Sequence, residues 1–410
     1  MRSIDIAILG GGVSGLSMGY FLKDDREFCV FEAEQNTGGL VSTDMLGNLT
    51  FDRGGHFLHF RSPSTRSLLR RLPEFTKTLQ PFTRKAGVLH KGEIVTYPFQ
   101  QHYDQLHNPS KEDRRIARAK GKPKDFQQWI ESKFDQYSVR EFLVPYNKKF
   151  WQVPLSRMAY AWAETFMPDK RSPKKRDGYN KKFYYPQGGI GTLAEALHNA
   201  IRNNVVTGKK AVAVSLSGKT IKFSDGETVR YNTLVNTIPL PEFMRIAKAR
   251  SARVDSLRST RTVIFNCAGR LEKMHGLHWV YVAEPDTVFY RIGRYTPFLP
   301  TGNVNLDTFY VEVSAQGKDP VSALQERMIQ DLIKSGFVAS RNALTVHVAH
   351  DLDYAYPIPL LKTASTVEAI RQQLAKSSVL LLGRFGAWEY WSIEDCLVAA
   401  RGLAGKLENG

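Results

Sequence analysis

Cysteine is scarce in this sequence, and long apolar runs are absent from it. The 410 residues include three cysteines, Cys29, Cys267 and Cys396, which lie far apart and form no CxxC pair. This small, odd number argues against a disulfide framework and fits a reducing compartment, so we expect a cytoplasmic protein without a metal site. No apolar run approaches the roughly 20 residues that cross a bilayer, and a strand pattern already begins at Ile4. We therefore expect neither a transmembrane segment nor a cleavable signal.

Acidic residues are too few to balance the basic ones. The chain has 57 Lys and Arg against 40 Asp and Glu, which gives a formal charge of +17. The excess is concentrated in residues 111–124 and 170–176, which contain proline or glycine and little apolar periodicity. We interpret both as exposed loops; attraction of a phosphate-bearing small molecule is a second interpretation. No nucleic-acid recognition motif accompanies the charge, so we expect no nucleic-acid partner.

Residues 4–32 follow the pattern of a dinucleotide-binding βαβ unit. An apolar strand at residues 4–9 leads into the glycine-rich segment 10–15 and then into a helical pattern. A second strand at residues 28–31 ends in Glu32. The order of strand, glycines, helix, strand and acidic residue makes this signal far more specific than isolated glycines.

Each part of this unit has a physical task. Gly10 permits the tight turn, Gly12 lets the backbone approach a pyrophosphate, and Gly15 lets the helix pack closely on the strand. Glu32 stands where an acceptor for a ribose hydroxyl is expected. The predicted cofactor contacts in this unit are Gly10, Gly12, Val13, Ser14, Gly15, Glu32 and Ala33.

A second glycine pair, Gly38-Gly39, favours FAD over NAD as the cofactor. A second close approach of the backbone suits a ligand with two phosphates and a long ribityl arm. Gly39 and Leu40 are therefore added to the predicted cofactor contacts. The arrangement resembles the amine-oxidase-like FAD proteins, in which an arginine usually stands where this chain has Leu40.

The rest of the chain alternates between helical and strand-like stretches. Residues 63–182 have largely helical periodicity, whereas residues 205–236 and 262–315 show short strand patterns. Near the C-terminus, an apolar strand at residues 378–382 breaks into a glycine turn, and a helix follows over residues 393–407.

These patterns predict an α/β fold with a Rossmann-type FAD-binding domain, an inserted helical region and a mainly antiparallel β-sheet substrate domain. The FAD-binding domain is predicted to be discontinuous and to contain residues 1–62, 183–262 and 365–410. The helical region is predicted at residues 63–182 and the substrate domain at residues 263–364.

Further motifs resemble the UDP-galactopyranose mutases of the eukaryotic-like branch, within the amine-oxidase-like superfamily. They run in family order from residue 8 to about residue 400. The motifs are Asp52 to His56, Tyr97 to Gln100, Pro145 to Trp151, Met158 to Trp162, Phe183 to Gly191, His278 to Tyr281, Phe289 to Arg291, Tyr356 to Pro359 and Gly383 to Trp388.

The resemblance implies a mutase that interconverts the pyranose and furanose forms of a nucleotide sugar with no net redox change. N5 of the reduced flavin is then the nucleophile that displaces the nucleotide diphosphate from the anomeric carbon. FAD would be active in its reduced form, with NAD(P)H as a possible reductant. The partner is then a small-molecule nucleotide sugar; no sequence feature indicates an oligomeric state.

The resemblance also implies roles for individual residues. The implied catalytic residues are Arg291, Tyr356 and His56. The implied substrate contacts are Tyr97, Gln100, Asn147, Trp151, Asn180, Tyr281, Arg291, Tyr356 and Glu389, and the implied further cofactor contacts are Gly55, His56, Val212, Gly383, Arg384 and Glu394. Independently of the resemblance, the charge of Arg291 stands in an apolar run and requires a ligand or an ion pair.

The chain departs from the family pattern at two places where arginines are expected. Glu389 follows Trp388 in place of a second diphosphate arginine, and Glu164-Thr165-Phe166 replaces Gly-Glu-Arg. A carboxylate opposite a diphosphate would repel it. Three explanations are open: the basic loops at 111–124 or 170–182 supply replacements, the substrate is another nucleotide sugar, or the sugar carries a cationic group that pairs with Glu389.

Two other functions follow from the same features. One is a flavin oxidase or dehydrogenase of the amine-oxidase-like superfamily that acts on an amine or a sugar. The other is a flavin-containing binding protein for polyanions, which would bind nucleic acid in a salt-dependent way without flavin turnover.

Overall fold

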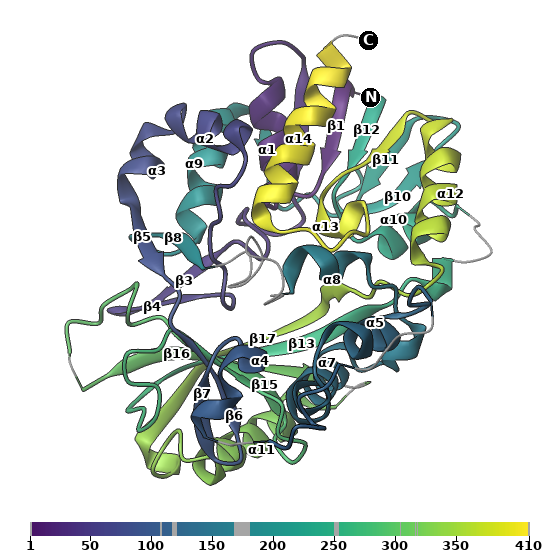
Figure 1. Ribbon diagram of the computed structural model, residues 1–410. Helices are drawn as coiled ribbons and strands as arrows, with labels where there is room; N and C mark the ends of the chain where they lie inside the picture. The colour runs from purple at the N-terminus through teal and green to yellow at the C-terminus, as the bar shows by residue number, and fades with distance from the viewer. Residues whose placement is uncertain are drawn as a thin grey trace.

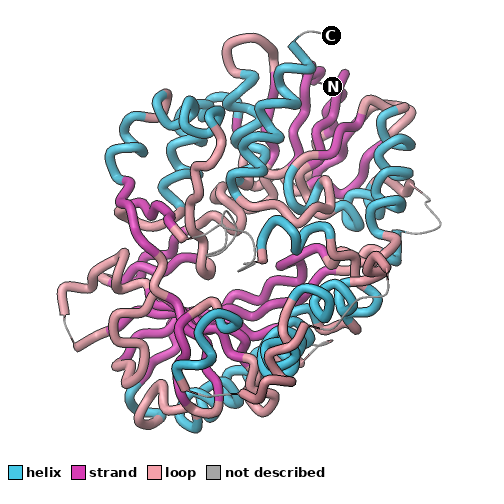
Figure 2. Tube along the Cα trace, viewed as in Figure 1, coloured by secondary structure: helices cyan, strands magenta, loops and turns pink. Residues whose placement is uncertain are grey.

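The structure is a computed structural model that describes residues 2–106, 109–116, 121–167, 181–249, 254–303, 305–315, 317 and 319–408. Two seven-stranded sheets organise the described residues, one in the upper and one in the lower half of Figure 1. Figure 2 shows their strands as two separate groups, one above the other. In the described ranges, no helix has the length and apolar character needed to cross a membrane.

The first sheet is built around parallel strands whose ends are level. Leu9 is paired with both Phe31 and Asn236, and Asn236 is paired with Leu381. The turns that follow these four residues therefore lie at one edge, where open parallel sheets bind ligands. The strands, in spatial order, are β10 (Ala211–Ser215), β11 (Thr220–Phe223), β12 (Thr228–Asn236), β1 (Arg2–Leu9), β2 (Phe28–Phe31) and β9 (Val205–Val206), with β18 (Val379–Leu381) beside β12.

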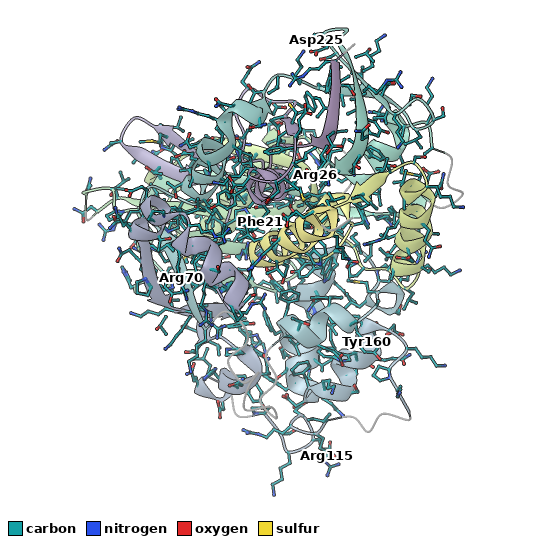
Figure 3. All side chains as sticks on the ribbon, turned by 90° about the horizontal axis from the view of Figure 1, so that it is seen from above. Phe21, Arg26, Arg70, Arg115, Tyr160 and Asp225 are labelled. Carbon is teal, nitrogen blue, oxygen red and sulfur yellow. The ribbon has the colours of Figure 1, made fainter. Side chains whose placement is uncertain are left out.

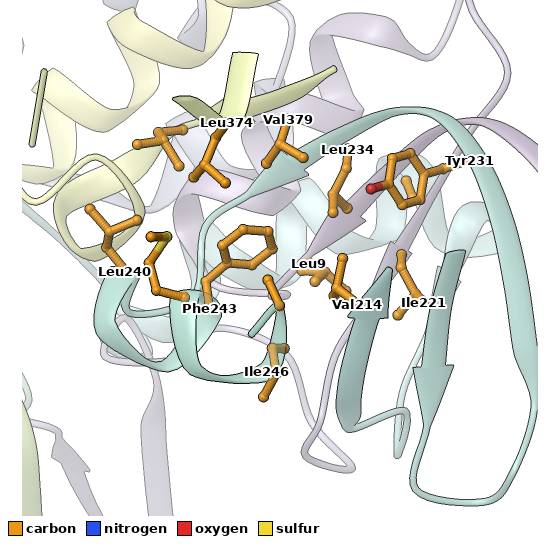
Figure 4. Packing of buried hydrophobic residues seen from close by; sticks show 14 of the residues in the cluster. Leu9, Val214, Ile221, Tyr231, Leu234, Leu240, Phe243, Ile246, Leu374 and Val379 are labelled. Carbon is orange, nitrogen blue, oxygen red and sulfur yellow. The ribbon is translucent and has the colours of Figure 1, made fainter. Parts of the chain in front are cut away.

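Helices cover both faces of this sheet. The side chains of β1 alternate between two cores: Ala7 and Leu9 belong to one, and Ile6 and Ile8 to the other. Figure 4 shows the first core, where Phe243 gathers with Leu9 and other apolar side chains. Helices α10 (Leu240–Ile246) and α12 (Thr363–Ala375) supply this core, and α1 (Val13–Leu22), α9 (Gly191–Ile201) and α14 (Ile393–Glu408) supply the other.

The second sheet is antiparallel except where β6 pairs with β14. Helix α11 (Val321–Lys334) packs on one face through Leu324, Met328 and Leu332. The predicted α/β fold with a mainly antiparallel second sheet is therefore confirmed. In spatial order the strands are β17 (Leu344–Pro357), β13 (Ser259–Gly269), β16 (Asp307–Ala315), β15 (Phe289–Arg294), β14 (Trp279–Val282), β6 (Ala86–His90) and β7 (Glu93–Thr96).

The predicted helical region contains helices but also three strands. The helical prediction is correct for α5 (Phe126–Lys133) and α7 (Val144–Trp151), and wrong for β6, β7 and β5 (Leu79–Thr83). All five residues of β6 are buried because this short apolar run pairs with β14 in the second sheet. The other helices here are α2 (Pro63–Arg70), α3 (Pro73–Thr78), α4 (Phe99–His102), α6 (Gln136–Ser138), α8 (Ala161–Phe166) and a π-helix at Val139–Leu143.

Short elements complete the described part of the chain. Strands β3 (Thr43–Leu46) and β4 (Leu49–Asp52) form a hairpin, and β5 pairs with β8 (Lys182–Pro186). The glycine turn predicted after β18 is a short helix, α13 (Gly383–Gly386). The 3-10 helices are Tyr103–Gln105, Leu155–Arg157, Arg202–Asn204, Val254–Ser256 and Arg341–Ala343.

The surface carries the basic residues of the run at 111–124 that the structure describes. Figure 3 shows Arg115 at the periphery of the molecule, and its side chain is exposed. The prediction of an exposed loop is thus confirmed for this part of the run. The run at 170–176 lies outside the described residues.

A fully buried carboxylate, Asp52, joins the hairpin to its surroundings. Its carboxylate accepts hydrogen bonds from the Thr43 hydroxyl at 2.5 Å, the Tyr185 hydroxyl and the Ile190 amide at 3.0 Å. Its carbonyl accepts a further bond from the Tyr295 hydroxyl at 2.7 Å. Burial raises the pKa of Asp52 to about 6 in spite of these bonds.

This pKa predicts a loss of stability between about pH 4 and pH 6. The unfolded chain releases the Asp52 proton near pH 3.9 and the folded chain only near pH 6, so the free energy of unfolding falls as the pH rises through this window. Relative to Asp52→Asn, the wild type should lose about 2 kcal/mol between pH 4 and pH 7 in urea unfolding. The exposed-site variant Asp286→Asn is the control, and an equal slope in wild type and Asp52→Asn would contradict the prediction.

Candidate functional site

A cavity of about 340 Å³ lies at the carboxyl edge of the first sheet. Gly10 has a φ of +103°, and a Cβ at Gly15 would lie 1.9 Å from the Gly10 carbonyl oxygen, so both positions require glycine. At Gly12 the nearest protein atom to an added Cβ is 3.9 Å away, which leaves open space in front of the turn. Helix α1 begins at Val13, so its free amides lie at this open space.

The second glycine pair lies against the first glycine turn. The Gly38 amide donates to the Gly11 carbonyl at 2.8 Å, and a Cβ at Gly39 would lie 3.5 Å from the Gly12 Cα. Leu40 also lines this cavity. The two glycine segments predicted to contact a dinucleotide are therefore adjacent.

Glu32 is held at the turn by main-chain amides. One carboxylate oxygen accepts from Gly11 at 2.6 Å and the other from Glu34 at 2.9 Å. Ala33, the next residue, is exposed. The carboxylate is thus fixed beside the glycine turn and remains half-buried.

Residues after β18 complete the cavity. Gly383 has a φ of +84°, and an added Cβ there would lie 2.4 Å from the Ser14 hydroxyl oxygen. Arg384 lines the cavity and donates through Nε to the Trp391 carbonyl at 2.7 Å. Val13 and Ser14 line it from α1.

Besides Glu32 and Ala33, two further predicted cofactor residues have side chains that do not line this cavity. The Glu394 carboxylate accepts from Arg61 Nε at 2.8 Å and from the Ser62 amide at 2.7 Å, so it fixes the start of α2. Val212 lies on β10, is 42% exposed and does not line the cavity. A cofactor contact from Glu394 would have to come from its main chain.

A second cavity, of about 230 Å³, meets the first at His56 and Arg384. Both cavities also share Trp391, Ser392 and Ile393. The predicted site residues that line the second cavity are Gly55, His56, Tyr97, Gln100, Asn147, Trp151, Tyr281, Arg291, Tyr356 and Arg384. The structure therefore brings together residues from the second sheet, from the helical region, from the loop at His56 and from the short helix after β18.

Aromatic side chains form much of the wall of the second cavity. The Tyr390 ring lies 5.8 Å from Tyr356, 5.7 Å from Trp151 and 5.2 Å from Trp162, measured between ring centroids. The Trp151 Nε1 and the Tyr290 hydroxyl are buried and have no hydrogen-bond partner among the described residues. Buried donors of this kind are costly unless a ligand satisfies them.

Arg291 forms a bidentate ion pair inside this cavity. Its Nε and Nη2 donate to the two oxygens of Glu312 at 2.7 Å and 2.6 Å. The side chains are 16% and 3% exposed. Burial opposes the charge of Arg291, but the facing Glu312 carboxylate raises the pKa of Arg291 well above its usual value. From the sequence, either a ligand or an ion pair could satisfy the charge of Arg291. The structure shows an ion pair, and Arg291 still lines the cavity.

His56 is a neutral imidazole at the junction of the cavities. Desolvation, followed by the positive charges of Arg384 and Arg291, lowers the pKa of His56 to about 3. Its Nε2 lies 3.1 Å from the Arg53 carbonyl oxygen, so this nitrogen carries the proton. His56 can therefore position a ligand but is not a cation at neutral pH.

Among the predicted substrate residues that the structure describes, Glu389 does not line the cavity. Asn180 lies outside the described residues. Glu389 is exposed, whereas its neighbours Trp388 and Tyr390 lie in the first core and in the cavity wall, respectively. Trp388 has a positive φ of 55°, and this backbone conformation directs the Glu389 side chain outward between two side chains that point inward. Repulsion of a ligand by Glu389 across the cavity is therefore not supported.

Sequence reasoning missed several residues of the site. Glu312, Arg53, Tyr390 and Trp391 were not predicted, although Glu312 stands out as a carboxylate inside an apolar strand. In the described ranges, no cluster of three or more His, Cys, Asp or Glu side chains could hold a metal ion.

Comparisons with known proteins agree with this arrangement. A family model, flavin containing amine oxidoreductase, matches residues 13–332. The chain is similar to the solved structure of a reduced UDP-galactopyranose mutase, with 22% identity and a TM-score of 0.88 over 100% of this chain and 94% of that chain.

Two further solved structures are similar over nearly the whole chain. One is a putrescine oxidase bound to putrescine, with 15% identity and a TM-score of 0.70 over 100% of this chain and 99% of that chain. The other is a fatty acid isomerase from P. acnes, with 12% identity and a TM-score of 0.71 over 98% of each chain. At these identities the likeness concerns the fold.

Proposed function

We propose that this chain, which belongs to the family of flavin containing amine oxidoreductases, is an FAD-dependent mutase that interconverts the pyranose and furanose forms of a nucleotide sugar. The observation that carries this proposal is the junction at His56 and Arg384. There the glycine-lined cavity opens into a cavity whose wall contains Arg291, Tyr356 and the other predicted substrate residues except Asn180 and Glu389. The likeness in fold to a reduced UDP-galactopyranose mutase supports the same reaction.

The first cavity fits the FAD that this proposal requires. Space remains in front of Gly12, the amides at the start of α1 are available to phosphate oxygens, and Glu32 is fixed beside the turn. The residues that would hold the cofactor are Gly10 to Gly15, Glu32, Gly39, Leu40, Gly383 and Arg384. A reduced flavin bound there supplies a nucleophile for covalent catalysis.

The residues of the second cavity suit a departing diphosphate. Glu312 holds the guanidinium of Arg291 through Nε and Nη2, which leaves Nη1 for a phosphate oxygen. The Tyr356 phenol is available as a further donor, and the Arg384 guanidinium lies 5.1 Å from the Tyr356 ring centroid. The aromatic wall around Trp151 would exclude water from the reacting sugar.

Tyr97 and Gln100 would bind the nucleotide. Both line the second cavity, and the Tyr97 ring lies 4.9 Å from the Tyr281 ring. Aromatic rings stack on a base, and an amide reads its edge by hydrogen bonding. The orphaned indole of Trp151 would donate to a sugar oxygen.

One observation favours flavin-dependent oxidation of an amine or a sugar as a second candidate. Glu312 already matches the charge of Arg291, so this residue offers a diphosphate less net positive charge than a free arginine would. The fold likeness to a putrescine oxidase is consistent with this alternative.

A comparison of the reduced and oxidised protein distinguishes the two functions. The holoprotein, with and without dithionite, is incubated with UDP-galactopyranose, other nucleotide sugars and putrescine, and the products are separated by chromatography. The mutase predicts a ring isomer from a nucleotide sugar with the reduced protein only, without hydrogen peroxide. Turnover by the oxidised protein with stoichiometric peroxide would establish the oxidase instead; free FAD is the control.

The position of Glu389 predicts a small effect of Glu389→Arg on substrate binding. Because this side chain is exposed and does not line the cavity, the added positive charge should change the Kd for a UDP-sugar by less than about threefold, as for exposed charges generally. Titration of the reduced protein would measure this. A tenfold gain in affinity would instead show that Glu389 faces the substrate.

A further inference from the structure

Arg53 is an arginine at the cavity junction with only weak partners. It directly precedes Gly54 and lines the cofactor cavity together with Gly39, Leu40 and His56. Its Nη1 is 3.5 Å from the Gly39 carbonyl oxygen, and its Nη2 is 3.7 Å from Asp44. Its Nε is buried and has no hydrogen-bond partner among the described residues. Well-formed charged hydrogen bonds are about 2.7–2.9 Å long, so neither contact uses the guanidinium fully.

The carboxylate nearest to Arg53 lies closer to a histidine than to Arg53. Asp44 lies 2.9 Å from His350 Nε2 on β17, whereas Arg53 is 3.7 Å away. By comparison, the ion pair between Arg291 and Glu312 has two contacts of 2.6–2.7 Å. Arg53 therefore keeps donors for a ligand.

The charges around the junction are unbalanced toward positive. A small pocket here is lined by Arg53, Arg291, Arg384 and Glu312. Glu312 matches Arg291, His56 is neutral, and Arg53 has only the 3.7 Å contact with Asp44, so Arg384 has no carboxylate partner among the described residues that line this pocket and Arg53 has a weak one. Such a junction favours an anion.

We propose that Arg53 stabilises the anionic reduced flavin in preference to the oxidised flavin. The inference rests on the proposed function, which puts FAD in the cavity that Arg53 lines. A flavin that takes up two electrons and one proton carries one negative charge, whereas the oxidised ring is neutral. A cation at the junction therefore binds the reduced form more tightly and raises the reduction potential. Arg53 would supply the positive charge that Leu40 does not.

Removal of this charge predicts a more negative flavin potential. The holoproteins of wild type, Arg53→Gln and Arg53→Lys are equilibrated with a reference dye under anaerobic conditions. Arg53→Gln should bind reduced flavin roughly tenfold more weakly relative to oxidised flavin, which is a shift of about 30 mV for a two-electron couple. Arg53→Lys, which keeps the charge, should remain closer to wild type. Arg270→Leu, which removes a 71% exposed arginine, should leave the potential unchanged.

Two results would overturn the inference. An unchanged potential in Arg53→Gln would show that Arg53 does not act on the reduced ring. Equal weakening of oxidised and reduced flavin, measured by dissociation constants, would show that Arg53 binds the phosphates instead. Absence of flavin from the wild-type protein after incubation with FAD would overturn the proposed function as well, and is read from the absorbance spectrum before any variant is made.

Discussion

Replacement of Arg291 by methionine is expected to lower the free energy of unfolding by about 4 kcal/mol. The change leaves the Glu312 carboxylate, which is 3% exposed, without the guanidinium that donates a hydrogen bond to each of its two oxygens. An isolated buried charge is far costlier than the pair is favourable, so the loss comes from the partner left behind. Urea unfolding of the apoprotein measures this without any contribution from ligand.

The double variant Arg291→Met/Glu312→Met distinguishes the contribution of the ion pair to the free energy of unfolding from the contribution of side-chain packing. It should regain most of the lost stability and differ from wild type by about 1–2 kcal/mol, because two apolar side chains can replace a buried pair. A double variant that is no more stable than Arg291→Met would contradict the account of Arg291. Both variants should lose mutase turnover, since Arg291 is proposed to bind the diphosphate.

Gly12→Ala is expected to abolish flavin retention without destabilising the apoprotein. A Cβ at Gly12 meets no protein atom closer than 3.9 Å, so the fold accommodates it, but the methyl group occupies the space left for the cofactor. The affinity for FAD should fall by roughly two orders of magnitude. The flavin-to-protein absorbance ratio and the Tm of the apoprotein are the two measurements.

Gly15→Ala is the matched comparison, three residues along the same turn. Its Cβ would lie 1.9 Å from the Gly10 carbonyl oxygen, so the turn itself must move. We expect loss of flavin together with a loss of about 1–3 kcal/mol of apoprotein stability. If Gly12→Ala retains FAD as wild type does, the glycine turn is not the cofactor site.

The parts of the fold that depend on local sequence were predictable. The strand, glycine turn and helix from Ile4 to Leu22 follow from short-range patterns, because each glycine there answers a local steric requirement. Strand β6 was missed because its partner β14 is far along the chain, and a short apolar run alone does not specify its partner.

The missed features of the site depend on side-chain direction and on distant partners. A resemblance in sequence suggested that Glu389 faces the substrate, but the backbone at Trp388 sends Glu389 outward and Tyr390 inward. The need of Arg291 for a partner was visible in the sequence, whereas the identity of Glu312 depends on the register between β15 and β16. Arg53 reaches the cavity through the hairpin that Asp52 holds in place.

The redox state of the flavin during turnover tests the central claim most directly. The holoprotein is reduced under anaerobic conditions, the excess reductant is removed, and UDP-galactopyranose is added while the absorbance spectrum and the products are followed. The proposed mutase predicts many turnovers to the furanose form, with a fully reduced flavin at the end of the reaction. Substrate consumption matched one to one by a change in flavin oxidation state would contradict it.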